Sequence, residues 1–566
     1  MKKIIALLVS LSIVFGLCSA VAQAVALEPD ISYAVASDLH YNVPDEELEW
    51  FSEDPIYGYA NRRAAMENES GLIIDEMLRQ VAEDDNIDFL LISGDLADNG
   101  RRLVEEHYAV AEKLKNFEET SGKQVYVIPG NHDYGNLGEY CVTDAAKFKE
   151  IYAEFGYDRA ITIDGLSYTA NLGDKYRLIA LDSNDPDKST EDGMTDAKVN
   201  WVIKEAQKAY DAGRYPILML HHNLLDHMPL QRVLSHDFII RNHTATANKW
   251  ADAGIKLVFS GHEHCSDATT HTTASGNTIS DFATTSLTMY PLQYRYMEMY
   301  EDTITYEPKT VDSIDTDALV EAVDGYSDEQ IAEMNKGLNA FAKQYLKNGV
   351  EYRLERGFND EQLGIKPGDI YYNLVRGAVD AFNDVLNMPL YGEGSAQELA
   401  KEYNIDIPDS DYKDGWDVAT ELVAAHYEGS EDYPLHEEDV KLLFLMMSLV
   451  IKSEFDFIDD QAFHQAAASI LANYEIEAID TILKMVSAEE EGVTAGEYLL
   501  VAIASPLLDS FANDDGVDDN YGAIDGYGRT DTSSNITNSF TSSALDIANK
   551  LYIFLRYIVA MLNLWI

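Results

Sequence analysis

Cysteine is almost absent from this chain, which contains three cysteines among 566 residues. A disulfide-rich secreted scaffold needs several cysteine pairs and is therefore excluded. Cys18 lies in the N-terminal apolar segment, so a processed chain would keep Cys141 and Cys265. These two residues could form one disulfide or remain two free thiols.

Basic residues are also scarce, because 41 lysines and arginines stand against 99 aspartates and glutamates, for a formal net charge of −58. Such an excess of negative charge keeps a protein soluble and opposes binding to a nucleic-acid backbone or an anionic bilayer. We therefore expect no nucleic-acid partner. An enzyme of this charge that acts on anionic substrates needs local positive charge, which metal ions can supply.

Long apolar runs are confined to the two ends of the chain. A short basic start, an apolar core over residues 4–17 and a small-residue cleavage site predict a signal peptide over residues 1–26. Leu17 is too large for a good lipoprotein signal at Cys18. The expected protein is bacterial and secreted, or associated with the cell surface.

The C-terminal apolar run, residues 551–566, is 16 residues long and is interrupted by Arg556. It is too short to span a membrane comfortably, so we expect a buried terminal helix and no transmembrane span in the mature chain.

The first half of the chain, up to about residue 310, alternates short apolar runs with helical stretches. The runs are bounded by Gly, Pro, Asn or Asp and predict buried strands at 31–38, 87–95, 124–132, 176–183, 216–222 and 255–264. Helical patterns cover residues 71–84 and 197–213. This alternation predicts an α/β domain with a largely buried sheet.

The second half has a different pattern. Residues 327–349 predict one helix that begins with a capping box between Ser327 and Gln330 and ends before Gly349. Further helical patterns cover 369–387, 416–427, 437–452, 460–473 and 543–562. We predict a mainly helical second domain. The acidic, glycine-rich stretch 509–528 is interpreted as a solvated linker, because Phe511 would occupy the first ligand position of a calcium loop.

Side chains that can bind metal gather where the predicted strands end. They form the motifs D-x-H, G-D-x-x-D, G-N-H-D, H-H and G-H-E-H, and the candidate residues are Asp38, His40, Asp95, Asp98, Asn131, His132, His221, His262 and His264. Successive strand ends meet along one edge of such a sheet, where ligands bind. Carboxylate, amide and imidazole donors suit borderline and harder divalent metals. Seven or eight donors exceed the need of one tetrahedral ion and favour a pair of ions, which suits displacement at phosphorus.

These five motifs, in this order, resemble the calcineurin-like metallophosphoesterases over about residues 31–300. The wording of "SDLH", "SGDLADNG", "IPGNHD" and "SGHEH" is similar to bacterial cyclic-nucleotide phosphodiesterase-like members. The resemblance implies an α/β (α+β) fold, a four-layer αββα sandwich with central sheets, over residues 27–310. A mainly α-helical domain of unknown role would follow over residues 311–566.

The resemblance also implies a role for each candidate residue. One metal ion would be held by Asp38, His40, Asp95 and His264, and the other by Asp95, Asn131, His221 and His262, with Asp95 bridging. His132 would contact the phosphoryl oxygens or protonate the leaving group, and Asp98 would orient His132. The ions, Mn, Fe, Zn or similar, would generate hydroxide at neutral pH.

Several neighbouring side chains have simpler interpretations. Asp98 has the alternative of capping a turn, Asp133 is expected to brace its turn, and His222 is expected to neighbour the site without binding metal. Histidines on loops, namely His227, His236, His243 and His271, are expected to be polar surface. Histidines in helical patterns, namely His107, His426, His436 and His464, are expected to be structural.

Residues 41–64 form a long loop after the first strand, rich in aromatic residues and carrying Arg62 and Arg63. Long loops of this kind are often functional, so a substrate-facing lid and a loop packed on the domain are the two alternatives.

The sequence predicts a secreted phosphoesterase for small phosphomono- or phosphodiesters. A cell-surface interaction protein whose helical half is the functional part is the alternative. A metalloprotease is disfavoured, since no H-E-x-x-H motif is present. Substrate identity, metal identity and oligomeric state stay open.

Overall fold

The computed structural model describes residues 28–43, 64–138, 141–228, 231, 237–300, 303–354, 367, 383–402, 407, 409–430, 442, 446 and 518–525. The predicted signal peptide, the C-terminal apolar run and most of the loop 41–64 lie outside these ranges. Among the helices within them, none has the length and apolar character needed to cross a membrane.

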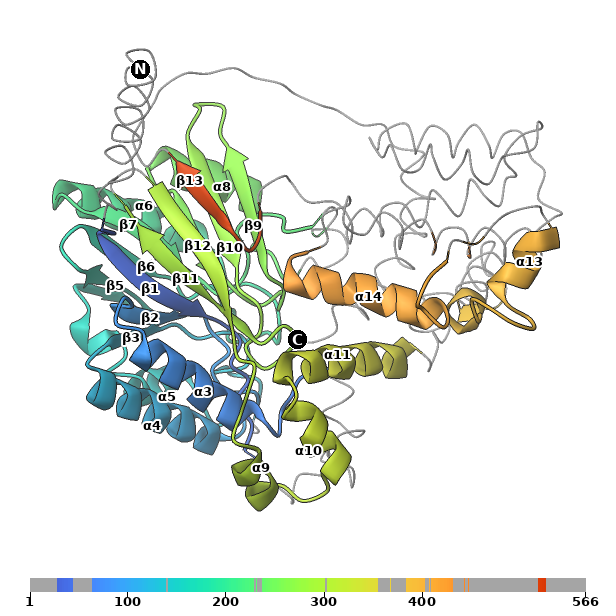
Figure 1. Ribbon diagram of the computed structural model, residues 1–566. Helices are drawn as coiled ribbons and strands as arrows, with labels where there is room; N and C mark the ends of the chain where they lie inside the picture. Colours follow the sequence, from blue (N-terminus) through green and yellow to red (C-terminus); the bar gives the residue numbers. More distant parts are fainter. Residues whose placement is uncertain are drawn as a thin grey trace, which may run out of the picture.

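The first sheet has six strands in the order β13-β12-β11-β1-β2-β3. Its parallel part consists of β1 (Ile31–Ala36), β2 (Phe89–Ile92) and β3 (Gln124–Val127). Its antiparallel part consists of β11 (Gln293–Met299), β12 (Thr303–Thr310) and β13 (Gly522–Asp525). Figure 1 shows β13, in red, beside β12, which it joins from almost the other end of the chain.

The second sheet has seven strands in the order β4-β5-β6-β7-β8-β10-β9. They are β4 (Thr162–Asp164), β5 (Ser167–Leu172), β6 (Tyr176–Ala180), β7 (Tyr215–Met219), β8 (Leu257–Ser260), β9 (Asp267–Thr272) and β10 (Thr278–Ala283). The run β6-β7-β8-β10 is parallel, and the strands at both edges are antiparallel.

The two sheets pack face to face, with helices outside each. Tyr33 on β1 and Phe259 on β8 are fully buried and meet edge to face across the interface, with ring centroids 5.8 Å apart. The outer helices are α3 (Ser70–Glu83), α4 (Val104–Ser121) and α5 (Ala145–Ile151) for the first sheet, and α6 (Asp196–Asp211) and α8 (His243–Asp252) for the second. A short 3₁₀ helix covers Tyr157–Arg159. The predicted four-layer sandwich is confirmed, with two mixed sheets where the strand pattern alone had suggested one.

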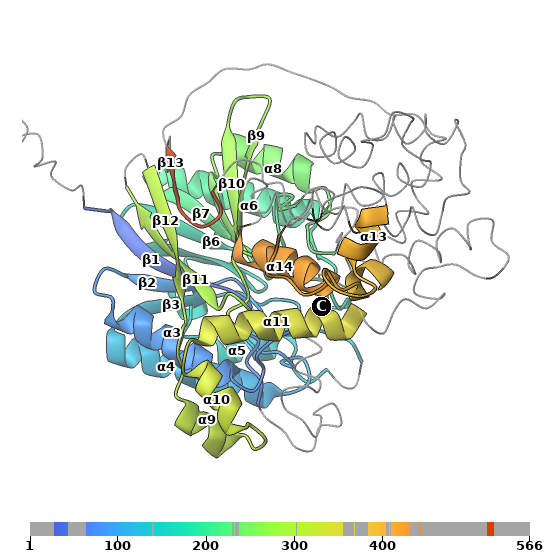
Figure 2. The same ribbon diagram turned by 45° about the vertical axis from the view of Figure 1, so that its right-hand side comes forward.

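The described part of the second half contains helices, as predicted, besides the strand β13. Its helices are α9 (Thr316–Ala322), α10 (Asp328–Met334), α11 (Leu338–Leu354), α13 (Ala396–Glu402) and α14 (Gly415–Glu428). Helices α11 and α14 lie side by side in both views (Figures 1 and 2). The predicted helical stretches after residue 430, apart from residues 442 and 446, lie outside the described residues, as does most of 369–387.

The prediction of one helix over 327–349 is wrong. The capping box of Ser327 and Gln330 begins α10, but the chain turns at residues 335–337 and α11 starts afresh. Asp312 fixes this second start, because its carbonyl and carboxylate accept the backbone N–H groups of Leu338 (3.1 Å) and Asn339 (3.1 Å). Gly349 lies inside α11, where a glycine costs a helix about 1 kcal/mol relative to alanine.

The interpretation of 509–528 as a solvated linker is also wrong for residues 518–525. Gly522–Asp525 forms β13, which pairs with β12 from Thr303 to Tyr306. Asp519, three residues before β13, is buried, with 4% of its surface exposed. Composition suggested a loop, but an open sheet edge supplied backbone partners that override weak local propensity.

The interface between the sheets predicts a stability effect. Replacing Phe259 with Ala removes a fully buried ring and should lower the free energy of unfolding by about 3–5 kcal/mol. Urea unfolding followed by tryptophan fluorescence measures the change. Ile163→Ala is the matched control, since Ile163 is 45% exposed. Equal effects of the two substitutions would contradict a core between the sheets.

Candidate metal centre

The loops that follow β1, β2 and β8 hold their candidate ligands in left-handed backbone conformations. The φ angles are 49° for Asp38, 40° for His40, 49° for Asp95, 71° for His262 and 64° for His264. Such conformations cost of order 1–3 kcal/mol each in residues other than glycine and gather at functional sites. The strand ends therefore turn sharply and aim side chains into one place.

Backbone pairing holds these strained loops together. Asp38 N–H donates to the Gly94 carbonyl (3.0 Å) and His40 N–H donates to the Asp95 carbonyl (3.0 Å). Glycine precedes Asn131 and His262 because a Cβ at Gly130 would collide with the Asp95 carboxylate, and one at Gly261 would collide with Ser37 and Asp38. The motif glycines therefore allow carboxylates to approach the backbone closely.

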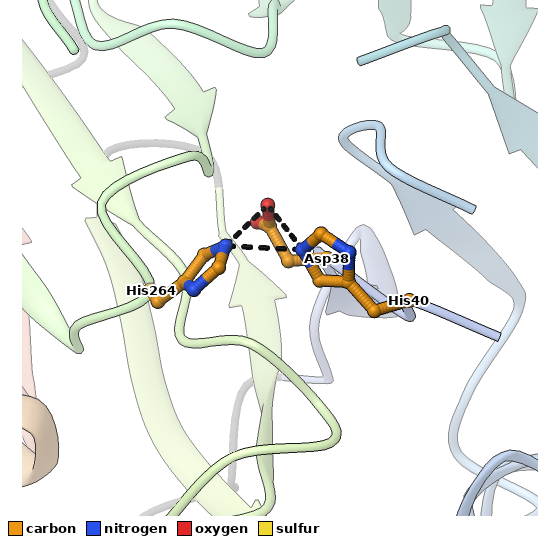
Figure 3. A group of neighbouring side chains, drawn as sticks. All are labelled: Asp38, His40 and His264. Carbon is orange, nitrogen blue, oxygen red and sulfur yellow. Dashed lines mark hydrogen bonds and ion pairs between the residues drawn. The ribbon is translucent and has the colours of Figure 1, made fainter. Parts of the chain in front are cut away.

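Asp38, His40 and His264 form the first cluster (Figure 3). The Nε2 atoms of the two histidines are 3.1 Å apart, and His264 Nε2 is 3.3 Å from Asp38 Oδ1. His40 Nδ1 lies 3.1 Å from Asp98 Oδ1, and His264 Nδ1 lies 3.2 Å from the Met289 sulfur. With both Nδ1 atoms engaged elsewhere, the two Nε2 atoms and the carboxylate oxygen converge on one point.

Asp95, His221 and His262 form the second cluster, with Asn131 beside it. His221 Nε2 is 3.3 Å from Asp95 Oδ2 and 3.0 Å from Asn131 Oδ1. Asn131 donates its amide N–H to the Ser189 carbonyl (3.2 Å), which turns Oδ1 toward the cluster. His221 Nδ1 lies 2.9 Å from the Ser93 carbonyl, so its Nε2 faces the site.

Asp95 joins the two clusters. Its Oδ2 lies 3.3 Å from His221 Nε2 and 3.8 Å from His40 Nε2, so one oxygen faces both groups. Its other oxygen accepts the His132 backbone N–H (2.7 Å). This is the position that a carboxylate bridging two ions would occupy.

The donor set fits bound cations. The seven predicted ligands are buried, with at most 5% of any of them exposed. Within the part of the chain that the structure describes, both ring nitrogens of His262 and Oδ1 of Asp38 have no hydrogen-bond partner. Buried polar atoms are normally paired, and leaving one unpaired costs free energy. Cations at the two clusters would satisfy these atoms and separate the facing imidazole nitrogens of His40 and His264.

The protonation states of Asp95 and His262 favour ligation, whereas that of His221 opposes it. Burial alone would raise the pKa of Asp95, but the surrounding imidazoles, first that of His221, hold it well below its usual range. Burial and the neighbouring His222 and His221 hold the pKa of His262 well below that of a free imidazole. Burial would lower the pKa of His221, but Asp95 raises it to about 9, so a metal ion must displace a proton there.

His132 is the most exposed of the candidate residues, with 17% of its side chain open to solvent. Its Nδ1 lies 2.6 Å from the backbone carbonyl of Asp98 and 3.9 Å from the Asp98 carboxylate. That carboxylate is 3.1 Å from His40 Nδ1 and accepts from the Asn99 side chain (3.1 Å). Asp98 therefore contacts His132 most closely through its main-chain carbonyl and His40 through its carboxylate. Orientation of His132 by Asp98 stays a prediction.

Residues 31–266 match a known family, described as calcineurin-like phosphoesterase. This part of the chain is a calcineurin-like phosphoesterase domain. This match, together with the clusters of potential ligands, identifies residues 31–266 as a metal-dependent phosphoester hydrolase domain.

Solved structures with some likeness include a dimetal phosphatase from Danio rerio, at 12% identity and a TM-score of 0.37, covering 50% of this chain and 96% of that one. A 5'-nucleotidase from Candida albicans has 12% identity and a TM-score of 0.29, and the match covers 56% of this chain and 59% of the nucleotidase chain. At these TM-scores the likeness adds nothing to the geometry. No curated protein matches the chain.

Several neighbours of the phosphoesterase site behave as predicted. Asp133 braces its turn by accepting the N–H groups of Ala97 (3.1 Å) and Gly130 (2.7 Å). His222 is a neighbour, with ring nitrogens 2.8 Å from the Ser183 hydroxyl and 2.9 Å from the Thr190 carbonyl.

Near the site, the structure decides between the two alternatives for the cysteines and overturns the expectation for His227. Cys141 and Cys265 are free thiols, and Cys141 Sγ donates to the Gly135 carbonyl (2.9 Å), so no disulfide ties the loops. His227 is not polar surface but is buried between two carboxylates, 2.5 Å from Asp267 and 3.2 Å from Asp281.

The contacts that sequence reasoning missed are those that orient the ligands. The carbonyls of Ser93 and Ser189 and the sulfur of Met289 hold His221, Asn131 and His264 in turn. A carbonyl carries no side-chain signature, so no pattern could have found the first two. Ser93 immediately precedes the G-D motif, which is a weak positional signal at most.

The position of His227 predicts a pH effect on stability. Burial would lower its pKa, but Asp267 and Asp281 raise it from 6.5 to about 10. The stabilising ion pairs are thus complete below about pH 6.5 and are lost as pH rises through about 10. The midpoint of thermal unfolding should be lower for His227→Gln than for the wild type at pH 7, and the gap should narrow above about pH 9.

The matched control for this prediction is His271→Gln, since His271 lies half-exposed on β9 with Asn248 Oδ1 as its partner at 3.0 Å. Its gap from the wild type should stay flat over the same pH range. A gap for His227→Gln that is constant to pH 10.5 would contradict a buried histidinium.

Proposed function

We propose that this protein is a secreted dinuclear-metal phosphoesterase that hydrolyses small phosphomono- or phosphodiesters. The observation that carries the proposal is the Asp95 carboxylate between two clusters of buried donors, one with Asp38, His40 and His264 and one with Asn131, His221 and His262. The number and type of these donors suit two borderline divalent ions such as Mn, Fe or Zn. The predicted signal peptide supports secretion.

Two bound ions would lower the pKa of a water molecule and neutralise charge that develops on the phosphoryl group. The chain itself supplies orientation: Asp98 fixes the ring of His40, and the Ser93 carbonyl fixes that of His221. These contacts hold the ligands rigid, as partners of metal-binding histidines commonly do.

His132 is proposed to donate the proton that the leaving group needs. Because its Nδ1 is held by the Asp98 carbonyl at 2.6 Å, Nε2 is the nitrogen that can face a substrate. Its partial exposure beside the buried clusters suits a residue that meets the substrate. A positioned acid of this kind contributes about 10²–10⁴-fold to the rate.

The alternative function is a cell-surface interaction protein whose helical half does the work and whose metal site is accessory. The completeness of the donor set favours the enzyme, because an accessory site has no need of strained backbone at five ligand positions.

Removal of metal tests the proposed function. EDTA should abolish hydrolysis of bis-nitrophenyl phosphate or nitrophenyl phosphate, and Asn131→Ala or His221→Ala should nearly do so, because each removes a donor from the second cluster. The control His271→Ala should keep wild-type activity. Wild-type protein that is loaded with manganese, iron or zinc and is inert on both substrates would refute the enzyme.

The role of His132 is tested by varying the leaving group. Nitrophenolate leaves readily without a proton, whereas an alkoxide does not. His132→Ala should therefore reduce kcat/KM far more for an alkyl phosphoester than for its nitrophenyl counterpart. Equal losses on both substrates would contradict proton donation and favour contact with the phosphoryl oxygens.

A further inference from the structure

The loop that carries His262 and His264 finds its partners in the far C-terminal part of the chain. Two residues beyond His264, Ser266 donates its backbone N–H to the Tyr427 carbonyl (3.1 Å) and its hydroxyl to Asn520 Oδ1 (3.1 Å). The N–H of Ala268 then donates to the Asp519 carboxylate (2.8 Å). None of these partners lies in the segment that matches the phosphoesterase family.

Asn520 joins the two C-terminal segments to each other. Its side-chain N–H groups donate to the carbonyls of Glu428 (2.7 Å) and Gly429 (2.9 Å). Carbonyls at the end of a helix such as α14 have no partner within the helix. Gly429 has φ of 67° and abuts Ser266 so closely that a Cβ would collide with its carbonyl. The Asn520 side chain thus connects the end of α14 with Ser266, in the loop that carries His262 and His264.

Arg295 on β11 also connects Asp519 with the loop that follows His264. Its guanidinium is buried and donates to the Asp519 carbonyl (2.5 Å), the Ser266 hydroxyl (3.0 Å) and the Asp267 carbonyl (3.1 Å). A rigid, fork-shaped donor with several carbonyl partners fixes their relative positions.

The end of α14 also reaches the second loop that touches His264. Tyr290 donates its hydroxyl to Glu428 (2.5 Å), and the neighbouring Met289 contacts His264 Nδ1 through its sulfur at 3.2 Å. In both views the near end of α14 lies by the lower ends of β9 and β10, and β13 runs along β12 (Figures 1 and 2).

We propose that residues 427–429 and 518–525, here called the C-terminal clamp, position His264 for the ion that it would share with Asp38 and His40. Asn520 is its central positioning residue. The inference rests on the proposed function, and it makes the second half of the chain part of the metal centre rather than an independent accessory domain.

The test uses full-length protein with substitutions at Asn520. Asn520→Ala removes all three hydrogen bonds, and the isosteric Asn520→Asp places oxygen where two donors faced carbonyls. Loss of a residue that orients a metal-binding histidine typically weakens metal binding about 10–100-fold. Both variants should therefore keep about one Mn²⁺ per chain at a chelator concentration where the wild type keeps two, and should lose the spin-coupled Mn²⁺ EPR signal. Added Mn²⁺ should restore both.

Tyr521→Ala is the matched control, because Tyr521 lies in the same segment with 61% of its surface exposed. It should retain two ions. Ser266→Ala should weaken binding of the same ion. In the double variant Ser266→Ala/Asn520→Ala the loss of ion affinity should be smaller than the sum of the two single losses, since both single variants break the Ser266–Asn520 hydrogen bond.

If Asn520→Ala and Asn520→Asp bind both ions with wild-type affinity, the proposal that the C-terminal clamp positions His264 is wrong. A lower unfolding midpoint of the metal-free variants without any change in ion affinity would also contradict it, and would show a purely structural contact. If Asn520→Ala does not fold, Asn520→Asp and Ser266→Ala decide by the same measurement. A wild-type protein that binds two ions and hydrolyses neither nitrophenyl ester would sink the proposed function, while the ion measurements would still decide on the clamp.

Discussion

The architecture depends on the burial of facing donors at the junction of two sheets. Asp38 and Asp95 lie among His40, His221, His262 and His264, almost without solvent, and within the described residues Oδ1 of Asp38 and both ring nitrogens of His262 make no hydrogen bond. Such an arrangement is unfavourable unless cations balance it, since unpaired buried polar atoms carry the full cost of desolvation. The rest of the fold therefore has to offset the desolvation cost of keeping these groups buried together.

The two sheets supply that stabilisation. Parallel strands from both end at the same place, and the loop pairing between Asp38 and Gly94 links neighbouring ends directly. Burial of Tyr33 against Phe259 keeps the sheets in contact a short way below the site. The left-handed conformations at five ligand positions are thus offset by sheet pairing and core packing.

The sequence predicted the ligands well because strand ends are easy to recognise. A run such as "KLVFSGHEH" marks both the buried strand and the residues just beyond it, and parallel strands then bring such ends together. The same reasoning could not find two sheets, because each strand of either sheet has the same apolar pattern. It could not find β13 either, since the pairing of Gly522–Asp525 with β12 depends on an available edge and not on local propensity. His227 was misassigned because burial between Asp267 and Asp281 is a property of the fold, and no spacing in the sequence records it.

The error over residues 518–525 changes how the two halves of the chain relate. Composition separates them at about residue 310, but Asn520 and Asp519 accept hydrogen bonds from Ser266 and Ala268, just beyond His264, across about half of the chain's length. If the C-terminal clamp positions that ligand, the metal-binding loop acquires its final geometry only after the last described segment has folded back onto β12. The ion held by Asp38, His40 and His264 would then bind late in folding. Its binding would report completion of the whole fold rather than of the phosphoesterase domain alone.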